Sequence, residues 1–355
     1  MAKNQANPTI KTVAQVAGVS HSTVSRVLNN NERVDPELRK KVLAAIKETG
    51  YTPNMAARTM KGQKSRIIGC LVPDLSMAYF KEFLASTVAE ARKHNYNILA
   101  ASSASSLKEE LNVLQSLANS IIDGVIFIPI SHSTVTEDLS IFGKTPVLIG
   151  YRNNLYSDHP HIAYDNKDGG YISTKYLLSL NRNKIAFVAG TFEETMTKEE
   201  FVFQAKHGPF GRYASIDRYN GYIRAHEEFN LPVNPDYLHF SKNTYEDGAM
   251  VAKRIISETV EVDGLVSFSD TIAIGAMNFF KSQNIHVPQD ISIIGYDDSP
   301  VCSQVQPTLT SINQDALKLG AECVSAMMDM INQKEVESKS LDVFLNIKES
   351  TIKKI

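Results

Sequence analysis

The 355-residue sequence is poor in cysteine: Cys70, Cys302 and Cys323 are widely spaced, and none belongs to a CxxC pair. This odd, scattered set argues against a disulfide framework and predicts reduced core thiols in a cytoplasmic protein. The first eight residues contain no apolar stretch, so we expect no signal peptide. The most apolar run, Ile121–Ile130, is short and is interrupted by charged, glycine and proline residues, which excludes a membrane span.

The motifs of nucleotide-dependent enzymes are missing as well. No G-x-G-x-x-G follows an expected strand, and no G-x-x-x-x-G-K-[ST] occurs, which argues against an NAD-dependent enzyme. No His/Cys cluster has metal-ligand spacing, and no nucleophile is paired with a base. Residues 165–170 resemble a calcium loop only superficially, because Lys167 occupies a ligand position and no spaced glutamate completes the loop. We therefore expect no enzyme activity, no cofactor and no metal.

Length and charge indicate more than one domain. A chain of 355 residues, 43% of them hydrophobic, is too long for one ordinary domain and can bury a sizeable core. Residues 1–66 hold 12 Lys/Arg and 4 Asp/Glu, a net charge of +8, whereas the remainder carries a net charge of −10. A basic head on an acidic body predicts binding of a polyanion by the head. The alternative is a basic disordered tail, but the head is rich in helix signals.

The basic head begins with two short helical patterns separated by a turn. Val13, Ala14, Val16 and Ala17 mark the apolar face of the first pattern. Gly18 follows, and glycine adopts positive φ more readily than other residues. The small alanines allow two helices to cross closely, as a helix-turn-helix motif requires.

The second pattern starts after Ser20, which is suited to capping a helix N-terminus. Its inward face is formed by Val24, Val27 and Leu28. The residues that point outward near its start, where a recognition helix meets base edges, are His21, Ser22 and Arg26.

A third helix is predicted from Asp35, which caps it, through Pro36 at its first position, to Gly50 at its end. Its apolar residues at helical spacing are Leu38, Val42, Leu43 and Ile46. Periodicity alone also fits a helical protein-interaction module.

A longer string is more specific than periodicity. Residues 14–29 read A-x-x-A-G-V-S-x-x-T-V-S-R-V-L-N, and residues 51–60 read Y-T-P-N-M-A-A-R-T-M. These segments resemble the headpiece and the hinge of the lac repressor family (the LacI–GalR group), and the resemblance continues through the rest of the chain. It implies a sequence-specific transcription regulator that binds a pseudo-palindromic double-stranded DNA operator as a homodimer and responds to a small-molecule effector.

The resemblance assigns roles to residues of the second helix. The positions that match base-reading residues in the major groove are His21, Ser22 and Arg26. Arginine suits this role because its guanidinium can bond guanine O6 and N7 together. The positions that match phosphate contacts, which set register without reading sequence, are Ser20, Thr23, Ser25 and Asn29.

The hinge and linker are expected at 53–65. The resemblance implies that residues 53–61 become helical on the operator and wedge an apolar side chain into the minor groove, kinking the duplex. The minor-groove residues implied are Ala57 and Met60. The family usually has leucine where this chain has Met60, and methionine is also apolar and long enough to intercalate, although more flexible.

From Arg66 onward, apolar strands alternate with helices. Strands are predicted at 67–72, 97–101, 124–128, 147–149, 184–189, 264–268 and 291–295, and helices at 78–94, 107–119, 169–180, 217–228, 246–259 and 271–283. This alternation predicts parallel sheets covered by helices on both faces. We therefore expect an α/β fold class: a small all-α helix-turn-helix headpiece and a two-lobed, doubly wound, periplasmic-binding-protein-like sensor domain.

Ligands of such sheets bind at the carboxyl ends of the strands, so a cleft between the lobes is the expected site. Tyr79 and Phe80 follow the first strand and are able to stack on a ligand; for Phe80, a place in the core is equally expected. Asp297 and Asp298 end a later strand, where a carboxylate can accept hydroxyl hydrogen bonds. Arg218 begins a helix and offers several donors to an oxygen-rich ligand.

The resemblance covers these loops too. The positions that match effector contacts are Tyr79, Phe80, Asp165, Arg218, Ser269 and Asp297. Asp270 is instead expected to cap the helix that follows it. The charge-rich stretch 191–216 is longer than the family usually has and borders the cleft; a solvated loop is expected there, with a lid or a partner surface as alternatives.

The expected domains are a headpiece at 1–52, the hinge at 53–65, and a sensor domain at 66–355. Its lobes are expected at about 66–180 with 314–342, and about 181–313 with 343–355. The resemblance favours a repressor of a carbohydrate-use operon, controlled by a sugar or sugar phosphate, and leaves open whether the effector releases DNA or promotes binding. An exported sugar-binding protein would share the sensor fold but not the basic head. The C-terminus lacks the leucine heptads that would build a tetramer, so we expect a dimer.

Overall fold

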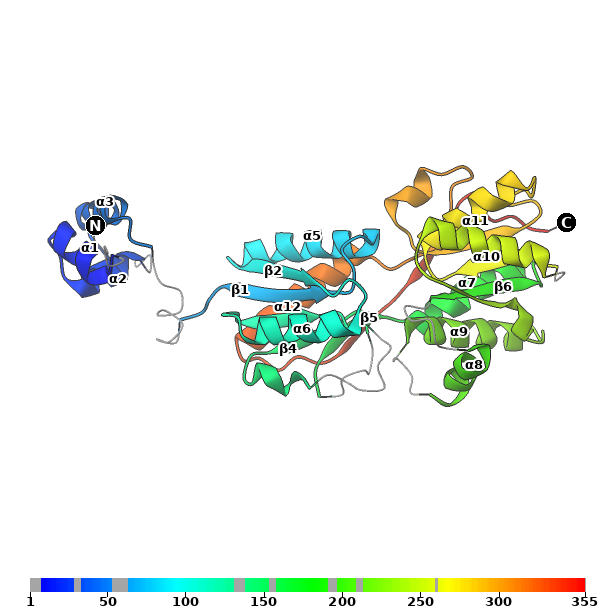
Figure 1. Ribbon diagram of the computed structural model, residues 1–355, viewed down its shortest axis with the longest axis horizontal. Coiled ribbons are helices and arrows are strands. Elements are labelled where there is room, and N and C mark those ends of the chain that lie inside the picture. Colours follow the sequence, from blue (N-terminus) through cyan, green and yellow to red (C-terminus); the bar gives the residue numbers. More distant parts are fainter. Residues whose placement is uncertain are drawn as a thin grey trace, which may run out of the picture. The chain divides into compact units, whose positions relative to one another are not determined.

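The computed structural model describes residues 8–28, 33–52, 63–130, 138–152, 158–190, 197–208, 213–258 and 261–354 (Figure 1). Asn29, Ala57 and Met60 lie outside these ranges, as do parts of the hinge and of the 191–216 stretch. Contacts divide the chain into two units, Met1–Ser65 and Arg66–Ile355.

The first unit contains three helices, α1 (Ile10–Ala17), α2 (His21–Leu28) and α3 (Pro36–Thr49). Gly18 ends α1 in the left-handed conformation, with φ of 64°, as a turn between crossing helices requires. Asp35 caps α3, Pro36 occupies its first turn, and Gly50 ends it at φ 64°, as predicted. The buried side chains that hold the three helices together are Val13, Ala14, Val24, Val27, Val34, Val42 and Ala45.

Three apolar residues assigned to inward helix faces are exposed instead. Val16 is 45% exposed, Leu38 37% and Leu43 53%. A three-helix cluster covers only a narrow stripe of each helix. On α1, Val16 lies beside the line of residues to which the buried Val13 belongs. On α3, the side chain of Leu43 is turned about 100° from that of Val42. Both side chains therefore lie outside the covered stripe of their helix.

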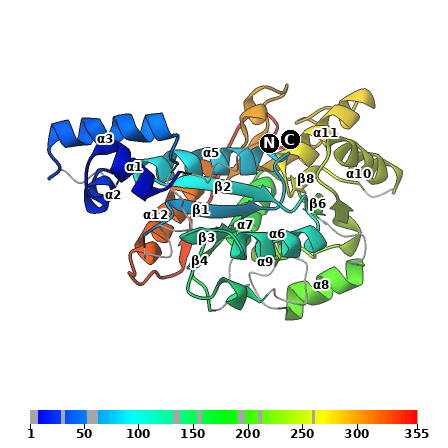
Figure 2. The same ribbon diagram turned by 60° about the vertical axis from the view of Figure 1, so that its left-hand side comes forward.

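The second unit contains two six-stranded sheets. All strands of the first sheet run parallel. Its order, visible in part in Figure 2, is β11 (Lys339–Leu341), β5 (His161–Tyr164), β4 (Val147–Gly150), β3 (Gly124–Phe127), β1 (Ile67–Val72), β2 (Asn97–Ser102).

The second sheet is parallel except for β12, which pairs antiparallel with β10. Its order is β12 (Phe344–Asn346), β10 (Thr310–Asn313), β9 (Ser292–Asp297), β8 (Gly264–Ser267), β6 (Ile185–Gly190), β7 (Leu238–Ser241). The interior strands are buried on both faces, which explains their continuous apolar sequences.

Helices cover both faces of each sheet. Around the first sheet, α5 (Ala78–Lys93) and α12 (Ala316–Ile331) pack on one face, and α6 (Leu107–Ala118) with the 3₁₀ turn η1 (Leu139–Phe142) on the other. Around the second sheet, one face carries α10 (Tyr245–Ser257) and α11 (Asp270–Ser282). The other face carries α7 (Asn166–Ser179), α8 (Lys198–His207) and α9 (Ala214–Glu228). The remaining turns are η2 (Pro235–Tyr237) and η3 (Pro300–Ser303). We call the two halves the first and the second lobe.

The chain passes between the lobes three times: after β5, between β10 and α12, and between β11 and β12. The first crossover differs from the expected lobe boundary at residue 180. Leu177 and Leu178 of α7 pack with Phe187 of the second sheet, so the chain has already changed lobes at Asp165.

The charge-rich 191–216 stretch is also not simply a loop. Thr197 and Glu200 form a capping box that starts α8. Phe201 anchors this helix, because its ring lies 5.4 Å from Tyr219 and 5.3 Å from Phe240.

Helices α7 and α9 approach each other through glycines. A methyl group on Gly221 would collide with the backbone carbonyl of Lys167. We expect Gly221→Ala to lower the free energy of unfolding by about 1–3 kcal/mol, because backbone cannot yield as a flexible side chain does. Urea denaturation measures the loss, with exposed Glu227→Ala on the same helix as control. A Gly221→Ala change below about 0.5 kcal/mol would contradict this packing.

Candidate functional site

The first candidate site is the outer surface of α2. His21, Ser22 and Arg26 are exposed, while Val24 and Val27 of the same helix are fully or almost fully buried. The helical period therefore presents an imidazole, a hydroxyl and a guanidinium on the solvent side. All three are able to bond base edges in a DNA groove.

Hydroxyl groups gather at the N-terminus of α2. The Ser20 Oγ accepts from the Thr23 backbone N–H at 3.2 Å and lies 2.8 Å from the Ser22 hydroxyl and 2.9 Å from the Thr23 hydroxyl. This bond is the predicted helix cap. Together with the unbonded first-turn N–H groups, these hydroxyls are suited to a DNA phosphate.

The second candidate site lies between the lobes and centres on Arg218 of α9. Its side chain is only 3% exposed. Nε donates to Asn166 Oδ1 at 2.9 Å, Nη1 to the Phe268 carbonyl at 2.7 Å, and Nη2 to the Tyr151 hydroxyl at 3.2 Å. The guanidinium also lies 3.4 Å above the Tyr296 ring centre. These bonds use three of the five N–H donors of an arginine, so two remain for a ligand.

The charge of this buried guanidinium is stabilised by its surroundings. Burial alone lowers the pKa of Arg218, but Tyr296, Tyr151 and Asp297 outweigh burial and raise it. Arg218 is thus a fixed cation that joins Tyr151 of the first lobe to residues of the second.

Aromatic rings form the first-lobe side of the cluster. Tyr79 and Phe80 are 4% and 3% exposed, and both rings pack against Tyr151 at 5.2 and 5.7 Å. Both therefore belong to the core of the first lobe. Within the described chain, the buried hydroxyls of Tyr79 and Tyr296 have no hydrogen-bond partner. Buried polar atoms are normally bonded, so these hydroxyls are candidates for ligand contacts.

Asp297 ends β9 with a backbone φ of 101°, which is rare for a residue with a side chain. Its Oδ1 accepts from Gln314 Nε2 at 2.9 Å. Burial and the nearby Asp270 raise the pKa of Asp297 to about 8, although Arg218 opposes this shift. The carboxyl therefore holds a proton near neutral pH and can both donate to and accept from a hydroxyl group.

Ser269, and not Asp270, caps the helix that follows them, so the expected capping role of Asp270 was wrong. Ser269 is the N-cap of α11: its hydroxyl accepts from the Ile272 N–H at 3.3 Å and donates to Asn243 Oδ1 at 2.6 Å. Asp270 is already helical and does not cap. The helix starts one residue earlier than the pattern indicates, which turns the Asp270 carboxyl into the interior.

There Asp270 accepts from the Ser299 N–H and hydroxyl, both at 2.7 Å, and from the Ser311 hydroxyl at 2.5 Å. Burial raises the pKa of Asp270 to about 6, against the effect of these hydrogen bonds. The residue thus ties the end of β9 to β10.

Two other carboxylates have structural bonds. Asp165 caps α7 by accepting from the Asp168 N–H at 2.9 Å. Asp298 is held by Lys348 Nζ at 2.6 Å and by the amides of Asn313 and Asn346. Of the neighbouring pair at the end of β9, Asp297 is therefore the one with bonding capacity for a ligand.

The structure adds residues that no sequence pattern indicated. Tyr151, Asn166, Gln314 and Tyr296 all contribute to the interlobe cluster, and the amide oxygens of Gln314 and of its neighbour Asn313 are buried without a partner in the described chain. Each lies at or beside a strand end. The strand-end rule, applied to every predicted strand, would have selected Tyr151, whereas Gln314 follows β10, a strand that the sequence pattern did not predict.

Comparisons with known proteins agree with this architecture. Residues 9–54 match the family model described as bacterial regulatory proteins, lacI family, and residues 174–351 match the periplasmic binding protein-like domain. The HTH-type transcriptional regulator RegA of Clostridium saccharobutylicum is 32% identical over 97% of this chain and 99% of its own length. Catabolite control protein A of Priestia megaterium is 30% identical, covering 94% and 95%.

Solved structures show the same fold. The lac repressor dimer bound to operator and the anti-inducer ONPF is similar, with a TM-score of 0.80, 22% identity and coverage of 98% of this chain and 100% of that one. A complex of the transcriptional regulator CelR with cellobiose has a TM-score of 0.68, 24% identity and coverage of 97% and 99%.

A helix-turn-helix headpiece joined to a periplasmic-binding-protein-like domain defines a DNA-binding transcription regulator rather than an enzyme. The chain belongs to the lacI family of bacterial regulatory proteins. None of its described helices is both long and apolar enough to cross a bilayer.

The raised pKa of Asp297 predicts a pH-dependent stability. The folded chain holds a proton that the unfolded chain releases above about pH 4, so this group stabilises less as pH rises toward 8. We expect Asp297→Asn to reduce the loss of unfolding free energy between pH 5 and 9, as measured by urea denaturation of ligand-free protein. Exposed Asp236→Asn is the control. Parallel pH profiles for Asp297→Asn and the natural chain would refute the half-buried, protonated carboxyl group.

Proposed function

We propose that the chain represses a carbohydrate-use operon and is controlled by a neutral sugar bound between its lobes. The observation that carries this proposal is the interlobe cluster, where Asp297, Arg218 and the hydroxyls of Tyr79 and Tyr296 retain unused hydrogen-bonding capacity. Several donors and acceptors beside aromatic rings suit a polyhydroxylated ligand. The CelR structure contains cellobiose, a ligand of this chemistry.

A neutral ligand fits the charges better than a phosphorylated one. Two buried cations border the cluster. The guanidinium of Arg218 is already engaged by three acceptors and a ring. Arg152 lies 5.1 Å from the Tyr151 ring centre, and its charge already interacts with the carboxyl groups of Asp217 and Glu110. Asp297 and Asp270 face the same region, and ionisation of either would repel an added phosphate. A sugar hydroxyl carries no such penalty.

Ligand control follows from the position of Arg218. It bonds Tyr151 of the first lobe as well as Asn166 and Phe268 of the second, so its contacts depend on the angle between the lobes. A ligand that bonds Arg218 and Asp297 in one arrangement stabilises that arrangement by the difference in its binding free energy. The effector thereby changes operator affinity.

We further propose that the headpiece, 1–52, reads DNA as anticipated from the family. The base-reading residues are His21, Ser22 and Arg26, and the phosphate contacts are Ser20, Thr23, Ser25 and Asn29. Hinge 53–65 would place Ala57 and Met60 in the minor groove.

Homodimers would bring two headpieces to the two half-sites of a pseudo-palindromic operator. Apolar side chains left exposed on the sensor domain support an interface between copies. Leu99 lies on the edge strand β2 and is 43% exposed, and Met250 of α10 is 60% exposed. An exposed apolar edge strand favours covering by another chain.

Arg26 is the sharpest test of DNA reading. Arg26→Ala should weaken binding to an operator, selected from random DNA by the natural chain, by about 1–3 kcal/mol and change binding to unselected DNA little. Fluorescence anisotropy titrations measure both affinities, and exposed Lys41→Ala of α3 is the charge-matched control. An equal loss on both DNAs would show that Arg26 contacts phosphate.

Asp297 is the corresponding test of effector binding. Thermal-shift screening of the natural chain with cellobiose, ribose and their phosphates identifies a stabilising sugar. Asp297→Asn should bind operator normally but lose the sugar's effect on operator affinity, a coupling of about 1–3 kcal/mol. Asp298→Asn should lower the melting temperature and keep the effect, because Asp298 bonds Lys348. An Asp297→Asn protein that melts early yet responds with normal sugar affinity would assign Asp297 a structural role.

A further inference from the structure

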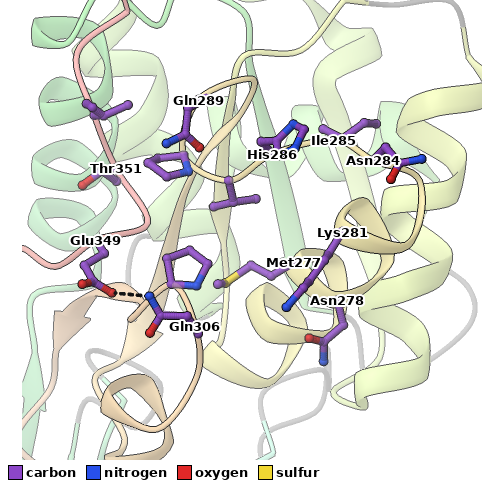
Figure 3. A pocket seen from close by; sticks show the side chains of 14 residues that line it. Met277, Asn278, Lys281, Asn284, Ile285, His286, Gln289, Gln306, Glu349 and Thr351 are labelled. Atoms are coloured by element: carbon purple, nitrogen blue, oxygen red, sulfur yellow. Dashed lines mark hydrogen bonds between the residues drawn. The ribbon is translucent and has the colours of Figure 1, made fainter.

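A cavity lies in the second lobe, away from the interlobe cluster. It has a volume of about 840 Å³ and is bordered by the end of α11, the 284–289 loop, Gln306–Pro307 and residues 349–352 (Figure 3). α11 and β9 run from one site to the other: Asp270 and Asp297 lie at their cluster ends, and Lys281 and the 284–289 loop at their opposite ends. The cavity is therefore a separate site, and its size is within the range of small-molecule pockets.

The walls of this pocket are held in place by internal hydrogen bonds. Arg182, which is 1% exposed, donates to the carbonyls of Pro288, Gln289 and Asp290 at 2.8, 3.0 and 3.1 Å, and to that of Ile352 at 3.4 Å. One buried side chain thus joins two walls that are far apart in sequence. A preformed pocket loses less conformational entropy when it binds a ligand.

A second set of bonds fixes the opposite wall. One carboxylate oxygen of Glu349, Oε2, accepts from Gln306 Nε2 at 3.2 Å and from the Thr308 N–H and hydroxyl at 3.0 Å each. The bonds from Thr308 lower the pKa of Glu349, so the carboxylate stays ionised. Its other oxygen, Oε1, takes no hydrogen bond within the described chain and remains available to a cationic donor.

The facing wall carries a positive charge. Lys281, in the last turn of α11, makes no hydrogen bond or ion pair with any residue that the structure describes. In Figure 3, Met277 lies between Lys281 and the Gln306–Glu349 pair. The apolar residues that line the pocket are Met277, Ile285, Val287, Pro288, Pro307 and Ile352. Carboxamides of Asn278, Asn284 and Gln289 lie along its border.

The pocket thus presents a cation and an anion separated by apolar surface and bordered by amides. We propose that it binds a zwitterion of the amino-acid class, either a free amino acid or a short peptide. The ligand's carboxylate lies on Lys281, its ammonium group on Glu349, and an apolar side chain on Met277. The carboxamides are suited to backbone N–H and C=O groups, because each both donates and accepts. A simple anion or a polyamine would satisfy only one of the two charges.

Calorimetric titration of the full chain with leucine and with the tripeptide Ala-Leu-Ala tests the proposal. Tighter binding of leucine assigns a free amino acid, and tighter binding of the tripeptide assigns a peptide. Lys281→Met should weaken the better ligand about tenfold or more, because it removes a charge-assisted hydrogen bond. Lys206→Met is the matched control, since Lys206 is also an exposed lysine in the last turn of a second-lobe helix.

The Glu349 contact is tested on the ligand, because a change of Glu349 would also release Thr308. N-acetylation of the better ligand, which removes its positive charge, should weaken binding about tenfold. Asp297→Asn should bind that ligand as the natural chain does, because the interlobe cluster is a separate site. The proposal is overturned if neither probe saturates by about 1 mM, if Lys281→Met or acetylation has no effect, or if Lys206→Met weakens binding equally.

Discussion

The sensor domain depends on one buried cation. Arg218 would be costly in the interior without compensation, because a desolvated charge needs hydrogen bonds and polarisable neighbours. The structure supplies Asn166, the Phe268 carbonyl, Tyr151 and the Tyr296 ring, and these come from both lobes. Separating the lobes would remove part of this compensation. The position of one lobe relative to the other therefore depends on the electrostatic interactions of this guanidinium as well as on apolar packing.

Most long helices and the continuous apolar strands of this fold follow from the sequence, whereas several other short strands do not. The pattern places β1 at its observed bounds and α5 within one residue, because continuous apolar strands and helical spacing are strong local signals. Strands β5, β7, β10, β11 and β12 have three or four residues and exist through pairing with distant segments. Helix α12 is different: Asp315 caps it and its apolar residues repeat at helical spacing, so local signals for it were present.

The two charged residues at the centre of the candidate site could be predicted from the sequence, but the residues that bond them could not. Chemistry at strand ends singles out Asp297, and a helix start after a long loop singles out Arg218. Asn166 and Gln314 reach them only because the crossovers bring residues 52 and 17 positions away alongside. A one-residue difference in the helix start is enough to move the capping role from Asp270 to Ser269, since it turns a side chain by about 100°. Tyr79 and Phe80 are buried in the core, where aromatic residues are most often found.

The crossovers place two residues of the interlobe cluster where a bound ligand would act on the lobe geometry. Asn166 follows the first crossover and Gln314 lies in the second, so two residues of the cluster sit on the segments that must rotate when the lobes move. Asp298 fixes the neighbouring strands, because its bonds with Asn313, Asn346 and Lys348 hold β10 and β12 together. Carboxylates with complete bonding thus hold the strand ends in place, while Asp297, with its proton and its strained backbone, is the carboxyl group that the proposed ligand would contact. A hydroxyl that bonds Asp297 and Arg218 together acts directly on the bonds that join the lobes, and lobe movement is then a consequence of binding.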